Sequence, residues 1–518
     1  MKKKIVLFFL FLLTPQLLSS NSHLSNKNIC KTNPNIFNIN TIKDTRIQNI
    51  EIDIQDYRKW TVNGLRVLIG NFRWVSEKYK KRFPANIVVN FDDGLKCKYS
   101  AKVRHSGNQK DHVELKENSI NQSIDVHLNA GNILGISKFK LLLKHTRGNY
   151  VDEIILTKLL REFNYISPRT NFINVTVNGI KTERIFQEKP GQITLKYHLR
   201  AEEALFESDE RFVFRLAEKL PDNNLSNWSL GMVPLIEDGI NSMLARHTNK
   251  DFIAKEKNKK SSFETLTNLN YIYLVYSNSY KNKKNNYFYG DYTFDNKLLG
   301  FGKSDNIMKL DIYNLLVSAA NGHHSLSANN RKFYWNKEMN FFEPVNYDNN
   351  ANIEFKSLKL IPPFTKKTEE AFDILDRMLK NLDANKFKKE LYLSGLDLSE
   401  KIIDDKMSTL RSNLKKLRIM YNNYIKNSEA EDQLADLEDE LFNKYFISTK
   451  KIDPNIRIVK YNSDSDIFES CLDFKECKNT KLTNENILDL LSGRLEIDKK
   501  EYQFFGSVDK KSKLLLTK

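Results

Sequence analysis

The sequence has few cysteines and lacks the spacing of a zinc site. It contains four, Cys30, Cys97, Cys471 and Cys477, with no CxxC pair and no Cys/His cluster, which argues against a structural zinc ion. The count is even, and in an oxidising compartment, such as an exported chain reaches, cysteines pair as disulfides. Cys471 and Cys477 are close enough in the chain to close a small loop, which would leave Cys30 and Cys97 for each other. Four cysteines nevertheless allow three pairings.

Long hydrophobic runs are absent after residue 13, so we expect no transmembrane segment in the mature chain. Residues 1–22 begin with Met1 and three lysines, continue with an apolar run at 5–13 and end in a polar stretch. This pattern predicts a secretory signal peptide, with an uncleaved membrane anchor as the alternative. No cysteine directly follows the run, which argues against a lipoprotein. We therefore expect an exported protein, periplasmic or extracellular.

Acidic residues are outnumbered by basic ones, 65 against 82, which gives a formal net charge of +17. Such a charge favours anionic partners, namely nucleic acid, anionic glycans, lipid headgroups or acidic proteins. An exported protein seldom meets nucleic acid, so we do not expect it as a partner. The lysines are spread along the chain, a pattern that a solvated basic surface also produces.

The first half of the chain has the short alternating patterns of β-structure. Between residues 50 and 103 the segments 65–69, 85–89 and 99–103 predict strands, and a strand pair follows around 123–128 and 138–143. Residues 152–163 have apolar side chains at helical spacing, with Asp152 and Glu153 near the amino end. The segments 172–177 and 181–187 flank Asn178-Gly179, which predicts a hairpin.

The second half is more varied. Residues 252–296 are rich in Asn, Lys and Tyr and predict an insertion or long loop with some strand character. A helical period begins near residue 369, and long amphipathic helices are expected over 398–445, interrupted near Asn427. Short apolar runs at 453–518 predict a small β-rich terminal element. We divide the chain into an amino-terminal β-rich segment (23–98), a core (99–360), a helical region (361–450) and a carboxy-terminal element (451–518).

Residues 321–352 contain the strongest candidate site. Two short strands around 333–335 and 341–347 are flanked by Asn329 and Asn330 on one side and Asp348 on the other. Antiparallel pairing would bring these side chains together, and a carboxylate with amide oxygens suits Mg²⁺. Protein kinases hold Mg²⁺ with an Asn and an Asp in comparable positions. The alternative is chance, because Asn is abundant in this chain and Asp-Asn-Asn is an ordinary turn signal.

Over residues 99–353, about half of the chain, the sequence resembles the spore coat protein H (CotH) kinase family, exported or surface-associated proteins with an atypical kinase-like fold. The matching features occur in the order of the family: Arg104-x-x-Gly107-Asn108, the 138–141 strand, the 152–163 helix, the 174–179 hairpin, Gln187-Glu188-Lys189, Asn329-Asn330 and Tyr347-Asp348. The resemblance implies an α+β, bilobal, kinase-like fold with a β-rich small lobe and a helical carboxy-terminal region.

The resemblance also implies how the small lobe would hold ATP. Lys140 would contact the nucleotide phosphates, with Lys138 and Lys144 as rivals in register, although strand lysines are more often solvated. Arg104 and Gly107 would form a turn that approaches phosphate, for which a plain β-turn is the alternative.

The remaining implied positions lie at the lobe junction and in the metal site. Glu188 would lie near the hinge beside the base, or else be a surface residue before Pro190. Asp348 would bind Mg²⁺, and Asn330 would be a second metal ligand or a catalytic-loop amide.

One departure concerns the catalytic base. The family commonly has an Asp a few residues before the Asn pair, whereas residues 321–328 contain no carboxylate. His323 or His324 could replace it, because imidazole titrates near neutrality. Both histidines could instead be structural or bind a metal.

We therefore expect an exported kinase-like enzyme that binds ATP and Mg²⁺ and transfers phosphate to Ser or Thr of an envelope protein. The alternative is an inactive scaffold that binds anionic glycans or partner proteins through its basic surface. A hydrolase acting on an envelope polymer is the third possibility, and the chain lacks a nucleophile motif or a convincing carboxylate pair for it.

Overall fold

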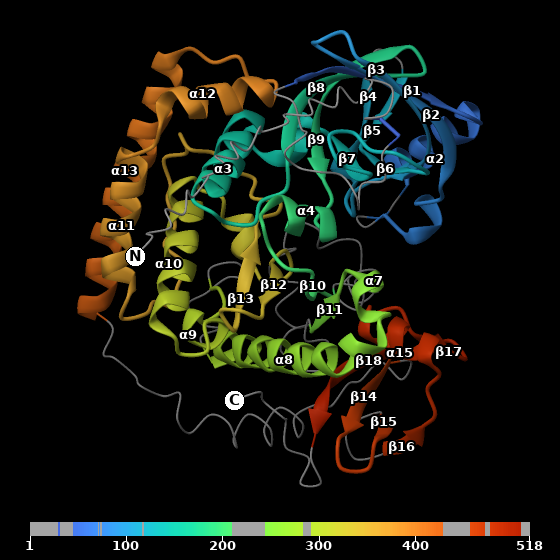
Figure 1. The fold of residues 1–518 in the computed structure, drawn as a ribbon, viewed down its shortest axis with the longest axis vertical. Helices are drawn as coiled ribbons and strands as arrows, with labels where there is room; N and C mark the ends of the chain where they lie inside the picture. Colours follow the sequence, from blue (N-terminus) through green and yellow to red (C-terminus); the bar gives the residue numbers. More distant parts are fainter. Residues whose placement is uncertain are drawn as a thin grey trace, which may run out of the picture.

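The structure is a computed structural model of the whole chain. It describes residues 30–31, 45–70, 72, 75–116, 119–209, 244–282, 292–427, 456–471 and 477–508. The fold class is α+β, as the sequence predicts, with a barrel, three further sheets and a helical layer (Figure 1). The expected signal peptide at 1–22 lies outside the described residues.

Seven strands form a closed barrel in the order β1-β2-β3-β6-β7-β9-β8. Their bounds are β1 Ile47–Ile54, β2 Phe83–Phe91, β3 Lys96–His105, β6 Ile124–Leu128, β7 Lys138–Leu143, β8 Thr170–Val177 and β9 Ile180–Glu188. All neighbours are antiparallel except β1 and β8, whose parallel pairing closes the barrel. Helix α2 (Tyr57–Ile69) packs beside the short hairpin of β4 (Val113–Lys116) and β5 (Ser119–Gln122).

Alternation along the strands builds the barrel core. In β3, for example, Tyr99, Ala101 and Val103 are buried, whereas Lys98 and Lys102 between and beside them are exposed. Inward apolar residues and outward charged residues are what a barrel strand requires. The disulfide between Cys30 and Cys97 fixes the chain before β1 to this core.

Helix α3 (Tyr150–Glu162) follows β7 and packs away from the barrel core. Asn149 caps its amino end by accepting a hydrogen bond from the backbone N–H of Val151. Its apolar residues join a helical core formed with α10 (Ser304–Ala319), α11 (Thr368–Lys380), α12 (Ala384–Leu393) and α13 (Glu400–Asn427). Figure 1 shows α3 between the barrel and these helices.

A four-stranded sheet, in the order β11-β10-β12-β13, lies on the other side of α10 (Figure 1). It consists of β10 (Leu205–Ser208), β11 (Ala245–His247), β12 (Lys332–Asn336) and β13 (Phe341–Val345). The long helix α8 (Lys259–Asn282) separates it from a carboxy-terminal sheet of β14 (Ile456–Asn462), β15 (Ile467–Cys471), β16 (Cys477–Thr480), β17 (Glu496–Ile497) and β18 (Lys500–Val508). Helix α15 (Asn484–Leu491) packs on that sheet, and one apolar core joins both sheets through α8.

Most of the predicted elements are confirmed. The 85–89, 99–103, 138–143 and 333–335 strands, the Asn178-Gly179 hairpin and the 152–163 helix all occur near the expected bounds. The cysteines pair as Cys30–Cys97 and Cys471–Cys477. Helix α13 ends at Asn427, and the expected continuation to residue 445 lies outside the described residues.

Two secondary-structure predictions are wrong. Residues 65–69 belong to helix α2, because Trp60, Gly64 and Val67 form a buried helical stripe that the alternating pattern concealed. Residues 252–296, expected as a loop with strand character, contain the helix α8, whose buried face includes Leu266, Leu269 and Tyr273. Among the residues that the structure describes, no helix combines the length and apolar content needed to cross a membrane.

Candidate functional site

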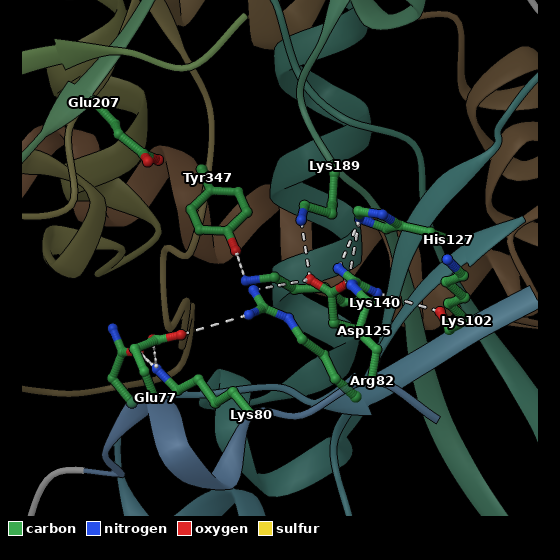
Figure 2. Close-up of polar contacts among 12 residues, drawn as sticks. Glu77, Lys80, Arg82, Lys102, Asp125, His127, Lys140, Lys189, Glu207 and Tyr347 are labelled. Carbon is green, nitrogen blue, oxygen red and sulfur yellow. Dashed lines mark hydrogen bonds and ion pairs between the residues drawn. The ribbon is translucent and has the colours of Figure 1, made fainter. Parts of the chain in front are cut away.

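The candidate site lies where the barrel meets the β12–β13 hairpin. Lys140 of β7 points out of the barrel and its Nζ donates a hydrogen bond to the phenol oxygen of Tyr347, just after β13 (Figure 2). Two further cations surround the same ring: Lys332 Nζ lies 4.6 Å and the Arg147 guanidinium 5.9 Å from its centroid. Residues from three separate parts of the chain therefore converge on Tyr347.

Asp348 occupies the centre of the site. Its backbone is left-handed, with φ 59°, a conformation that Asp and Asn tolerate better than most residues. Its side chain is 16% exposed, and Oδ1 lies 3.0 Å from Arg147 Nη1 and 3.5 Å from His324 Nδ1. Burial by itself would raise the pKa of Asp348, but the charges of Arg147, His324 and Lys140 hold it well below its usual range. The carboxylate is therefore ionised at all physiological pH values.

Helix α3 fixes the loop that follows Asp348. Glu153, fully buried, accepts hydrogen bonds of 3.2 Å from Asn349 N, Asn349 Nδ2 and Ala351 N. One residue earlier, Asp152 accepts a 2.9 Å hydrogen bond from Ile353 N. Two adjacent carboxylates at the start of one helix thus hold the backbone from 349 to 353 in place.

The loop carrying Arg147 approaches the same segment from the barrel side. A Cβ at Gly148, which has φ +53°, would lie 2.7 Å from the backbone oxygen of Asn350. Only glycine fits so close a contact, and this contact positions Arg147 against Asp348.

The two histidines have different surroundings. His324 donates from Nδ1 to the backbone oxygen of Asp348 at 3.0 Å, and its Nε2 lies 3.1 Å from Asn330 Nδ2. Desolvation opposes a charge on His324, but Asp348 raises its pKa, which makes it a poorer base at neutral pH. His323 instead contacts the backbone oxygen of Lys359 at 2.9 Å. The structure therefore brings His324 and Asn330 to Asp348 and places His323 elsewhere.

The donors around Asp348 fit Mg²⁺. Both of its closest charged contacts use Oδ1, and next to it in the chain Asn349 Oδ1 and Asn350 Oδ1 are buried without a hydrogen-bond partner among the described residues. A carboxylate with amide oxygens is a ligand set that Mg²⁺ accepts, completed by water and phosphate oxygens. Asp348 and Asn330 would hold the ion, and Arg147 would have to share the carboxylate with it.

A second carboxylate balances the lysines at this junction. Glu207 of β10 pairs with Lys332 and lies 2.7 Å from Arg246 Nη2. Burial opposes its charge, but Lys332, Arg246 and Lys140 lower the pKa of Glu207 to about 2. Lys140 itself has a pKa lowered by burial and by Arg147.

The structure places the two residues of the expected phosphate-binding turn, Arg104 and Gly107, in different surroundings. Arg104 lies on β3 opposite Asp125 of β6. Asp125 in turn lies opposite Lys140 of β7 in the strand register. Gly107 has φ +111°, and a Cβ there would lie 2.2 Å from the His112 ring. Arg104 thus belongs to the same barrel face as Lys140, whereas Gly107 serves the turn and its packing on His112.

Glu188 is a buried structural residue. It lies at the end of β9, where its carboxylate accepts three hydrogen bonds from Arg169. The donors are Nε at 3.0 Å, Nη2 at 2.9 Å and the backbone N–H at 3.1 Å. Burial would raise the pKa of Glu188, but Arg169 lowers it. This bidentate pair ties β8 to β9 at the barrel exit, and the carboxylate is committed to Arg169.

Sequence reasoning missed Arg147, Tyr347 as a contact of Lys140, and Asp125. Only the charged pair Asp152-Glu153 at a helix start gave a usable signal in the sequence. Outside the site, Glu469 lies with Cys471 and Cys477, but these cysteines form a disulfide and have no thiolate to offer. No protein-family model matches this chain, and no match is found among curated proteins.

Proposed function

We propose that this chain is an exported, bilobal kinase-like phosphotransferase, similar to the CotH kinase family, that binds ATP with Mg²⁺. Its acceptor would be a Ser or Thr hydroxyl of an envelope protein. The observation that carries the proposal is the convergence of Lys140, Arg147, Asn330 and Asp348 at one junction, with Glu153 fixing the loop after Asp348. The two disulfides agree with export.

The kinase catalytic Asp has no counterpart at residues 321–328, but four other side chains occur in the chain order of the corresponding protein-kinase parts. These are a strand lysine (Lys140), a helix glutamate (Glu153), an asparagine before a hairpin (Asn330) and an aspartate after it (Asp348). In this chain Arg147, rather than the strand lysine, is the cation beside the aspartate.

Each side chain has a role that follows from its contacts. Lys140 and Arg147 would neutralise phosphate oxygens, and Asp348 with Asn330 would hold Mg²⁺, which supplies charge neutralisation at the β- and γ-phosphates. In the transfer, the acceptor oxygen bonds to the γ-phosphorus, the bond to the β–γ bridging oxygen breaks, and ADP leaves. The hydroxyl proton passes to solvent or a phosphate oxygen, because residues 321–328 have no carboxylate and His324 is held towards its charged form.

A scaffold without catalytic activity is the second candidate. Two contacts favour this candidate, because they occupy side chains that a kinase would use for Mg²⁺ and phosphate. Arg147 pairs with Asp348, and Lys140 donates a hydrogen bond to Tyr347. Such a protein would use its basic surface to bind anionic glycans or partner proteins.

Thermal unfolding with ATP, with and without Mg²⁺, separates the two candidates. A ligand that binds only the folded state stabilises it by about 2.7 kcal/mol at a hundredfold excess over Kd, so a kinase-like site must raise the unfolding midpoint. The variant Asp348→Asn should lose the Mg²⁺-dependent part of this rise. Asparagine is chosen because alanine would strain the left-handed backbone at this position.

Asp466→Asn is the matched control, because Asp466 is also left-handed, with φ 54°, but lies in the β14–β15 turn. It should keep the full response. If ATP with Mg²⁺ leaves the midpoint of the wild-type protein unchanged, the phosphotransferase proposal is wrong and the scaffold is favoured.

A further inference from the structure

The outer face of the barrel next to the candidate site carries a cluster of basic side chains. Arg104, Asp125 and Lys140 lie in direct register across β3, β6 and β7. Their immediate neighbours Val103, Val126 and Phe139 are in the barrel core, so the Arg104 row points outward. Figure 2 shows Arg82, Lys140 and Lys189 near Asp125, and Lys80 beside Glu77.

Asp125 organises the cluster. Its side chain is only 3% exposed, and it lies 3.1 Å from Arg82 Nη2, 2.9 Å from Lys189 Nζ and 3.7 Å from Arg104 Nη2. Burial would raise the pKa of Asp125, but Lys189 and Arg104 hold it well below its usual range. One buried carboxylate therefore holds three cations at a fixed place on the barrel.

The cations outnumber the carboxylates. Besides Asp125, Glu77 contacts these cations directly, since it lies 2.9 Å from Lys80 Nζ and 3.7 Å from Arg104 Nη1. The charges of Asp348 and Glu207 also act on Lys140. The cations are five: Lys80, Arg82, Arg104, Lys140 and Lys189. His127, 3.4 Å from Asp125, adds no charge near neutrality, because burial lowers its pKa to about 4.

The hydrogen-bond donors of the cluster are also incompletely used. Arg104 Nε is buried and has no hydrogen-bond partner among the described residues, and both ion-pair contacts of this guanidinium are 3.7 Å long. Burial, followed by neighbouring cations, lowers the pKa of Lys80 and Lys140, and burial lowers that of Lys189. Crowded, half-buried cations with a spare donor are the environment that a bound oxyanion would complete.

We propose that Arg82, Arg104 and Lys189, placed by Asp125 and continued by Lys140, form a metal-independent binding site for a ligand with several linked phosphate groups. Arg104 and Lys140 are two strands apart, which corresponds to about 10 Å. A single phosphate would span only part of this row, whereas a chain of phosphates can contact all of it. Arginine suits such a ligand because its planar fork binds phosphate in a bidentate manner.

Two sources offer this chemistry: the triphosphate of a nucleotide and a free inorganic polyphosphate. The site does not require that the protein transfer phosphate, and it does not use Asp348. It shares only Lys140 and Arg104 with the proposed ATP site.

The test is calorimetric titration of the full protein with inorganic tripolyphosphate in the presence of EDTA. Arg82→Gln and Lys189→Gln should each weaken binding about tenfold, as expected for the loss of one charge-assisted contact. Lys98→Gln is the matched control, because Lys98 is an exposed lysine on the same strand and face as Arg104 but six residues away, about 20 Å. It should bind within about twofold of the wild-type protein.

An equal loss in Lys98→Gln and Arg82→Gln would show a diffuse basic surface and overturn the proposal, as would the absence of tripolyphosphate binding. The variants should be compared at equal folded fraction, verified by their unfolding midpoints, because Asp125 loses a partner in Arg82→Gln and in Lys189→Gln. The double variant Arg82→Gln/Asp125→Asn keeps the net charge of the cluster; if it binds as tightly as the wild-type protein, the placement by Asp125 is wrong.

Titrations with ATP and with adenosine, also in EDTA, identify the source. ATP binding tighter than tripolyphosphate indicates a nucleotide, and equal or weaker ATP binding indicates the phosphate chain itself. Asp348→Asn should leave tripolyphosphate binding intact even if it abolishes the Mg²⁺-dependent response to ATP. Failure of the phosphotransferase proposal is thereby distinguishable from failure of this site.

Discussion

Replacing Glu153 by Gln should loosen the loop that positions Asp348. In the wild-type protein one carboxylate oxygen accepts from Asn349 N and Asn349 Nδ2, and the other accepts from Ala351 N. Glutamine has one acceptor oxygen. If this oxygen faces Asn349, the new amide NH₂ group faces the Ala351 N–H, and a buried donor loses its partner.

The magnitude follows from that single donor. An unsatisfied buried donor costs about 1–3 kcal/mol, so we expect the free energy of unfolding to fall by about 2 kcal/mol. The loss should be local, because the apolar contacts of α3 with the helical core and the hydrogen bond from Ile353 N to Asp152 remain. Urea unfolding measures the global change, and amide hydrogen exchange at Asn349 and Ala351 measures the local one.

Glu162→Gln is the control for this measurement. Glu162 ends the same helix and pairs at 2.8 Å with Lys386, whose side chain is 60% exposed. Exposed ion pairs contribute between 0 and about 1 kcal/mol, so this variant should change stability little and leave exchange at residues 349–351 unchanged. Similar losses in both variants, or unaltered exchange at Ala351 in Glu153→Gln, would refute the reasoning.

Two further outcomes are expected at the same junction. Tyr347→Phe removes the hydroxyl that occupies Lys140 and should raise affinity for tripolyphosphate about fivefold, the equivalent of one modest hydrogen bond; unchanged or weaker binding in calorimetry would contradict this. Burial opposes the charge of Glu207, but Lys332 and Arg246 lower its pKa to about 2, against about 4.3 in an unfolded chain. Its contribution, on the order of 3 kcal/mol, is therefore present above about pH 5 and lost as the pH falls towards 2. Glu207→Gln should flatten the pH dependence of unfolding over that range, and an unchanged slope would exclude this carboxylate as its source.

Local patterns predicted the elements whose partners are near in the chain. The hairpin at Asn178-Gly179 has a turn that only a few residue types allow, and φ is indeed positive at both positions. The β12–β13 hairpin likewise places Asp348 close to Asn330 through His324, as antiparallel pairing predicts. Periodicity decides these elements because each is completed within about 20 residues.

The rest depends on contacts that no local pattern records. Arg147 follows β7 in a short turn that no motif marks. Its guanidinium nevertheless lies beside the carboxylate of Asp348, which is 201 positions later in the chain. Glu188 was expected beside a base and proves to be paired with Arg169, because the fold brings the starts and ends of β8 and β9 together. Residues 65–69, the end of helix α2, are mistaken for a strand because the buried residues of the helix, Trp60, Gly64 and Val67, match the helical period only over its whole length.

The closure of the barrel has a consequence for how the chain acquires its structure. Strand β1 pairs with β2 on one side, but its other edge is satisfied only by β8, through pairs such as Ile50 with Val175. During synthesis the backbone groups on this edge of β1 therefore remain unpaired until more than a hundred further residues have been made. Contacts so distant in sequence slow folding, and an open edge can join strands of other chains. The barrel therefore closes only when β8 pairs with β1. Sequence changes that delay this pairing should increase aggregation during folding even if the final structure is unchanged.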